Sequence, residues 1–179
     1  MMRLLHELSP LQRMINSPDL DQAVAIIKRE LPETIIHEYS TGTKCEDWEV
    51  PKSWEVEEAF MKDKSGKIVA SYEECPLFVS PYSEPIEGWF SKKEIEGHLT
   101  TNQERPDAFL LEHRNAYDYH LKDWGITLPY RRWSTLPEDR YYVKISVHSS
   151  KSSMKVAEIF LKGERQETIC LCAHIDELC

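Results

Sequence analysis

The stretch Glu167-Thr168-Ile169-Cys170-Leu171-Cys172-Ala173-His174 is a continuous apolar run that ends in polar residues. An apolar run without alternation is typical of a strand buried on both faces, as in the parallel core of an α/β sheet. A second β-like run lies near the start of the chain, at residues 34–39. We therefore expect residues 167–174 to form a buried strand, adjacent and parallel to the strand at 34–39.

The runs between these two segments have a different pattern, because apolar and polar residues alternate at 56–60 and 142–147. Alternation predicts strands with one buried and one wet face. Four segments of this kind are predicted to form one antiparallel assembly, separate from the terminal strands: 54–61, 67–72, 141–148 and 156–161. A further short strand is predicted at 77–79, between turn signals.

Helices are predicted before this β-rich stretch and within it. Before it, apolar residues recur at helical spacing between Leu4 and Ile15, and Ser17-Pro18-Asp19 is the start of a second helix that Pro32 ends. Within it, Ser91 is followed three residues later by Glu94, which is the pattern of a capped helix start. One more helix is predicted over 114–123. The fold class is therefore α/β, with a sheet from the chain ends and a mainly antiparallel β-rich domain between them.

The composition excludes two classes of partner. The 179 residues carry a net charge of −9, and a nucleic-acid partner requires a basic surface. No segment approaches the roughly 20 consecutive apolar residues of a membrane span, and charge interrupts the N-terminus too early for a signal peptide. Five cysteines are an odd number in a chain without an export signal, which favours reduced thiols and a cytoplasmic location.

A candidate metal site follows the apolar run. In a strand, residues i and i+2 point to the same side, so His174 and Asp176 are expected to project together from its carboxyl end. A neutral imidazole is a good zinc ligand, and a nearby carboxylate fixes its tautomer and orientation. His-x-Asp is common by chance, however. Spacing by itself favours two residues that only cap a strand and hydrogen-bond locally.

The cysteines offer a rival zinc site, made of Cys170, Cys172, His174 and Cys179. The first three would share one strand face, which surrounds a tetrahedral ion poorly. We therefore expect these cysteines to be buried as small hydrophobic residues. Aromatic residues spread along the chain are a third candidate, as the lining of a sugar- or ligand-binding face. Their wide spacing favours core and turn positions instead.

Several ordered sequence blocks carry a resemblance to a known family. They are His37–Thr43, Asp47–Pro51, Trp54–Ala59, Val79–Gly88, Arg105–Ala108, Asp123–Pro129 and Cys172-Ala173-His174. In these blocks the chain resembles bacterial and archaeal aminopeptidase-like proteins, in which a β-rich domain is inserted early in a zinc-exopeptidase fold. The resemblance runs from about the first strand to the last residue, and it corresponds to the N-terminal portion of such proteins.

The resemblance implies roles for the two candidate site residues. His174 matches the family's first zinc ligand, and Asp176 matches the catalytic-site aspartate of the wider zinc-aminopeptidase pattern His-x-Asp, which orients a metal-bound histidine. The usual sequence of the family at these positions is Cys-His-Pro-Ser, whereas this chain has Ala173-His174-Ile175-Asp176. The implied cofactor is zinc in the full-length protein. Because the remaining ligands follow later in such proteins, this chain alone is expected to bind zinc weakly or not at all and to be inactive.

The resemblance also implies domains and partners. It implies that the sheet from the chain ends is an incomplete zinc-exopeptidase-like sheet. Residues 1–40 are the N-terminal part of a peptidase-like domain, residues 41–163 are the inserted β-rich domain, and residues 164–179 are the return strand. The implied substrate is a peptide or another amide, and exposed sheet edges favour a homo-oligomer. The alternative function is a stand-alone, non-catalytic β-rich module that binds a ligand or a protein.

Overall fold

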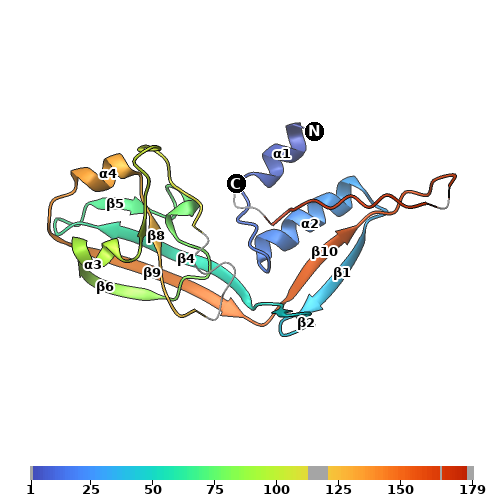
Figure 1. Cartoon of the computed structure of the whole chain (residues 1–179), viewed down its shortest axis with the longest axis horizontal. Coiled ribbons are helices and arrows are strands. Elements are labelled where there is room, and N and C mark those ends of the chain that lie inside the picture. The colour runs from blue at the N-terminus through green and yellow to red at the C-terminus, as the bar shows by residue number, and fades with distance from the viewer. Residues whose placement is uncertain (1, 113–120, 166, 177–179) are drawn as a thin grey trace. The chain divides into compact units, whose positions relative to one another are not determined.

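The computed structural model describes residues 2–112, 121–165 and 167–176. The chain forms two compact units (Figure 1). Unit 1 contains Met1–Trp54 and Ser149–Cys179, and unit 2 contains Glu55–His148. Unit 2 is therefore an insertion between two segments of unit 1, and it lies inside the 41–163 range predicted for the β-rich domain. The assignment of the flanking segments to a peptidase-like domain stays a prediction.

The described helices of unit 1 are α1 (Met2–Leu8) and α2 (Pro18–Glu30). Apolar spacing predicts a first helix between Leu4 and Ile15, but α1 ends at Leu8. The Ser17 hydroxyl caps α2 by accepting a hydrogen bond from the backbone N–H of Leu20 at 3.1 Å, which satisfies one of the free donors of the first turn. The face of α2 that carries Ala23 and Val24 is buried. The predicted helix start at Ser17-Pro18-Asp19 is confirmed.

Unit 1 also contains a two-stranded antiparallel sheet of β1 (Ile35–Ser40) and β10 (Ser153–Glu158). Its register runs from Ile35 opposite Glu158 to Ser40 opposite Ser153. A second, shorter antiparallel pair joins β2 (Lys44–Cys45) to β3 (Trp48–Glu49). The predicted strand at 34–39 is confirmed, but its predicted partner is wrong, because β10 occupies that position.

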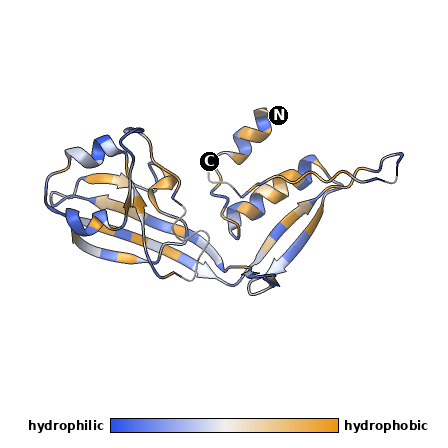
Figure 2. Cartoon of the chain, in the orientation of Figure 1, coloured by the Kyte–Doolittle hydropathy of each residue, from blue (hydrophilic) through white to orange (hydrophobic). Residues whose placement is uncertain are grey.

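The expectation of a buried strand at 167–174 is wrong. These residues have no regular secondary structure, and the side chains of Ile169 and Leu171 are 87% and 91% exposed. The segment is still apolar, as Figure 2 shows along the chain that follows β10. An apolar run indicates that a segment favours burial, but it does not identify what buries it.

Unit 2 is built on a four-stranded sheet with the order β5-β4-β9-β6, and its strands lie side by side in that order in Figure 1. The strands are β4 (Ser53–Lys62), β5 (Ile68–Ser71), β6 (Ile86–Ser91) and β9 (Arg140–Ser150). The pairs β4–β5 and β6–β9 are antiparallel. Three of the four predicted segments therefore share one sheet. The fourth, 156–161, was assigned wrongly, because alternation identifies a strand but not its partner.

The remaining elements of unit 2 connect these strands. They are the 3-10 helix η1 (Pro76–Phe78), α3 (Lys92–Glu96), β7 (Leu99–Thr100), β8 (Ile126–Thr127) and α4 (Tyr130–Thr135). Strands β7 and β8 pair in parallel. Ser91 and Glu94 form the predicted capping box of α3. The strand predicted at 77–79 is wrong: Pro76 starts a helical turn there, and only Val79 forms a bridge, to Ile126.

The helix predicted over 114–123 falls mostly on residues 113–120, which lie outside the described residues. Among the residues that the structure does describe, no helix is long and apolar enough to span a bilayer.

A close backbone approach joins two loops beside η1. The backbone N–H of Ser80 donates to the carbonyl oxygen of Gly125 at 3.0 Å, and the N–H of Gly125 donates to the Ser83 hydroxyl at 3.1 Å. A Cβ on Gly125 would lie 2.6 Å from the Ser80 Oγ, which is itself buried without a hydrogen-bond partner in the structure. Glycine is therefore the residue that permits this approach.

We predict that Gly125→Ala lowers the free energy of unfolding by about 1–3 kcal/mol, because overpacking forces the two loops apart. Adding Ser80→Ala removes the clashing hydroxyl and should recover more than half of this loss. Gly163→Ala is the matched control, since nothing lies within 4 Å of its Cβ position. Denaturant unfolding of the three variants measures the effect. A loss that Ser80→Ala leaves unchanged would contradict the steric explanation.

Candidate functional site

His174 and Asp176 lie against each other in the segment that follows β10. The His174 Nδ1 is 3.0 Å from the Asp176 Oδ1, and the side chains are 81% and 27% exposed. The i, i+2 spacing thus brings the two residues to the same side, although not at the end of a strand. Between them, the carbonyl oxygen of Ile175 accepts a hydrogen bond from the Arg13 Nε at 2.8 Å.

The residue between the pair fixes its position in unit 1. The Ile175 side chain packs against an apolar cluster formed by Leu11, Ala23 and Ile26. These residues come from α2 and the loop that precedes it, so the packing of α2 decides where the pair sits. The apolar contacts of Ile175 are therefore with helical and loop residues. The sheet that the sequence predicts around it is not seen.

The chemistry of the pair suits one part of a metal site. If the imidazole carries its proton on Nδ1, the carboxylate accepts that hydrogen bond and the Nε2 lone pair is free to bind a cation or a proton. Zinc suits such a nitrogen, so the two residues fit one ligand and its orienting group. In the described ranges, no group of three His, Cys, Asp or Glu side chains is arranged to hold a metal ion.

The expectation of buried cysteines is wrong for Cys170 and Cys172. Both are exposed free thiols, and their Sγ atoms are 3.8 Å apart. The hydrogen bond between Cys170 and Cys172 is the main reason why the pKa of the Cys170 thiol is raised above its ordinary value. Cys45 is also exposed and Cys75 is half-buried. Cys179, the fourth member of the rival site, lies outside the described residues.

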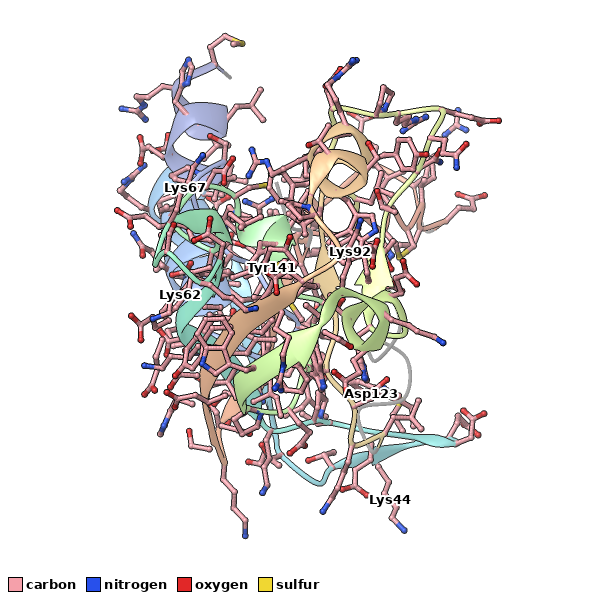
Figure 3. All side chains as sticks on the ribbon, turned by 90° about the vertical axis from the view of Figure 1, so that its left-hand side faces the viewer. Lys44, Lys62, Lys67, Lys92, Asp123 and Tyr141 are labelled. Atoms are coloured by element: carbon pink, nitrogen blue, oxygen red, sulfur yellow. The ribbon has the colours of Figure 1, made fainter. Side chains whose placement is uncertain are left out.

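A second histidine–carboxylate pair occurs in unit 2. The His98 Nδ1 lies 3.1 Å from the Asp123 Oδ1 and 3.0 Å from the Trp124 carbonyl oxygen, and its ring stacks on Trp124 with centroids 4.1 Å apart. Asp123 is labelled in Figure 3. The His98 carbonyl oxygen also accepts a hydrogen bond from the Ile126 N–H, so this pair joins β8 to the turn before β7. Its role is structural.

Sequence reasoning missed a group of aromatic side chains on one face of the large sheet. Phe60, Trp89 and Tyr142 come from β4, β6 and β9, and Tyr142 contacts both other rings. The signal was present for Phe60 and Tyr142, which occupy solvent-facing positions of predicted strands, whereas the strand that carries Trp89 was not predicted. Wide spacing along the chain concealed it, because strands distant in sequence are neighbours in the sheet.

Comparisons with known proteins place the chain in a family. A protein-family profile, DUF2172, matches residues 53–148 and is described as a domain of unknown function. The chain belongs to the DUF2172 family. The matched range corresponds closely to unit 2, so the family is defined by the β-rich unit and not by the segment that carries His174 and Asp176.

Relatives of this DUF2172 protein are longer. A Clostridium acetobutylicum protein is 30% identical over 171 residues, which are 96% of this chain and 38% of the relative. It is provisionally named a polysaccharide biosynthesis protein with an aminopeptidase-like domain. A crystal structure of a provisionally assigned peptidase from the same organism is 29% identical, with a TM-score of 0.78, over 92% of this chain and 38% of that chain.

These comparisons confirm the resemblance to aminopeptidase-like proteins. They also show that the mixed α/β fold with antiparallel sheets is shared with a solved protein that is described as a peptidase. The chain spans about two fifths of the length of these relatives, since 38% of each is covered.

The thiol pair leads to a prediction about reactivity. Cys172→Ala removes the hydrogen bond that raises the pKa of Cys170, so more Cys170 is thiolate at pH 8 and its alkylation by iodoacetamide should be faster. Mass spectrometry of the modified peptide gives the rate. Cys75→Ala is the control and should leave the rate unchanged. An equal or slower rate in Cys172→Ala would show that the two thiols do not interact in solution.

Proposed function

We propose that this chain forms part of a zinc-dependent, aminopeptidase-like amide hydrolase, with His174 as a metal ligand and Asp176 as its orienting carboxylate. The observation that carries the proposal is the 3.0 Å contact between the His174 Nδ1 and the Asp176 Oδ1. The resemblance of the chain to aminopeptidase-like relatives supports it. The substrate class that follows is a peptide or another amide.

Asp176 orients His174. Its carboxylate accepts a hydrogen bond from a proton on Nδ1, which selects the tautomer with a free Nε2. Asp176 is less exposed than His174, so the side of the ring with Nε2 is the one open to solvent. When bound, zinc supplies a Lewis acid that activates water for attack on an amide. The contribution of these two residues is to place and orient one ligand.

The pair does not complete a catalytic zinc site. Such a site normally has three protein ligands, and a single histidine with its carboxylate supplies one of them. The relatives extend well beyond the matched part. In our proposal the other ligands and the general base come from that additional length, so residues 1–179 alone are inactive. The exposed apolar segment that contains Ile169 and Leu171 would pack against the same additional part.

The first test is a calorimetric zinc titration of this chain. One ligand should give a dissociation constant of about 0.1 mM or weaker, equivalent to about 5.5 kcal/mol, and His174→Ala should abolish the binding. Asp176→Asn should weaken it. The control is His37→Ala, because His37 also forms an exposed pair with a carboxylate, Glu158, at 2.6 Å. Nanomolar binding that requires His174 would instead indicate a complete site that includes Cys170 and Cys172.

A second test uses the longer Clostridium acetobutylicum relative. Sequence alignment, which covers 96% of this chain, identifies the residue of the relative that corresponds to His174, and our proposal requires it to be a histidine. Replacing that histidine by alanine should reduce zinc-dependent cleavage of aminoacyl-p-nitroanilides by about 100-fold or more, because loss of a ligand disrupts the metal centre. Full activity in that variant would show that the corresponding position is not a ligand, and the proposal would be wrong.

A further inference from the structure

The outward face of the large sheet of unit 2 carries a row of aromatic rings across three strands. Trp89 on β6 is directly opposite Tyr142 on β9 in the antiparallel register, so their side chains share a face. The neighbouring residues of β9, Tyr141 and Val143, point to the other face and are buried. Phe60 on β4 completes the row through its contact with Tyr142.

The rings of Phe60 and Tyr142 are nearly parallel and form one apolar surface. Phe60 and Tyr142 are inclined by only 24° to each other, with centroids 6.2 Å apart. Trp89 meets Tyr142 at 67° with centroids 5.6 Å apart, so its ring rises from one side of this surface. Trp89 is 41% exposed, which is high for a large aromatic side chain.

Charged and hydroxyl groups surround the rings. The Tyr142 hydroxyl donates a hydrogen bond to a Glu87 carboxylate oxygen. One row further along the strands, the Lys144 Nζ is 2.5 Å from the Glu58 Oε2. Two rows further, the Ser146 hydroxyl donates to Glu57 at 2.8 Å. Negatively charged hydrogen-bond acceptors and positively charged donors therefore lie beside an apolar surface.

A flexible cation covers the centre of this face. The Lys62 Nζ lies 4.5 Å from the centroid of the Tyr142 ring and 5.4 Å from that of Phe60. Lys62 is labelled in Figure 3 at the end of β4. A lysine held by a cation–π contact on an exposed surface is weakly bound, and its long side chain swings aside at little cost.

We propose that this face, Phe60, Trp89 and Tyr142 with their charged neighbours, is a binding site for a neutral glycan chain. A pyranose ring presents a flat face of C–H groups and a rim of hydroxyls. The C–H face matches the stacked Phe60 and Tyr142 rings, and Trp89 closes one side. The rim hydroxyls donate to Glu58 and Glu87 and accept from Lys62 and Lys144, which gives charge-assisted hydrogen bonds.

Other occupants fit this surface less well. Nucleic acid also stacks on aromatic rings, but the acidic groups Glu57, Glu58 and Glu87 and the net charge of −9 repel phosphates. A proline-rich peptide docks in an aromatic-lined groove, whereas these rings form an open surface. The centre of a protein–protein interface is depleted in lysine and glutamate, which are abundant here.

The test is to screen the full 179-residue chain against an array of neutral oligosaccharides, namely gluco-, xylo-, manno- and N-acetylglucosamine hexamers. The array also carries a proline-rich peptide and a single-stranded DNA. Isothermal calorimetry then gives affinities for any ligand found. We expect at least one hexasaccharide to bind. Trp89→Ala and Tyr142→Ala should each weaken that binding by about tenfold, because each removes a stacking surface.

Tyr39→Ala is the matched control, since Tyr39 is a 40% exposed aromatic residue on β1 in unit 1. It should bind the same hexasaccharide as tightly as the unmodified chain. A folding defect is separated from lost binding by the tryptophan indole N–H resonances in NMR spectra. In the unmodified chain the hexasaccharide should shift the Trp89 indole resonance, identified by its absence in Trp89→Phe.

Three results would overturn the proposal: no hexasaccharide binds, the peptide or the DNA binds in its place, or Trp89→Ala binds sugar normally. None of these results bears on His174, because the sheet face and the histidine belong to different units. Zinc binding and glycan binding therefore succeed or fail separately.

Discussion

Strand β9 is hydrogen-bonded on both of its edges, to β4 and to β6, and the rest of unit 2 depends on this double pairing. Its alternating side chains divide the unit into an interior and an exterior. Tyr141, Val143 and Ile145 are at most 2% exposed and lie in the core, whereas Tyr142 and Lys144 face outward. A slip of one residue in this register would bury Lys144 and expose Val143. The core and the aromatic face are thus set by the same backbone hydrogen bonds.

The local features of this chain could be predicted from its sequence, and the long-range ones could not. Ser17 with Pro18 determines the start of α2, and Ser91 with Glu94 determines that of α3, because capping depends on residues within one turn. Three strands of the large sheet also follow from their alternation. Strand partners depend on distant residues, and for this reason the pairing of β10 with β1 was missed.

The same distinction between local and long-range features explains why only part of the candidate site was predicted. His174 and Asp176 are two residues apart, so any extended backbone brings them together, and their contact follows from spacing alone. Their surroundings do not follow, because Arg13 and the Ile175 contact with α2 come from the other end of the chain. The aromatic face is the opposite case. Phe60 and Tyr142 occupy predictable solvent-facing positions, but β6 with Trp89 was not predicted, and the surface exists only once β4, β6 and β9 are assembled.

The exposed segment after β10 has a consequence for the behaviour of the chain in solution. Residues 168–173, Thr-Ile-Cys-Leu-Cys-Ala, contain no charge and no proline, and they include two large apolar side chains with most of their surface in water. Short uncharged stretches of high β propensity are the segments that nucleate cross-β aggregation when they are exposed. The charged residues Glu164, Arg165 and Glu167 lie just before the stretch and oppose stacking of copies. Residues 1–179 should therefore stay dispersed best at low ionic strength, where these charges are least screened.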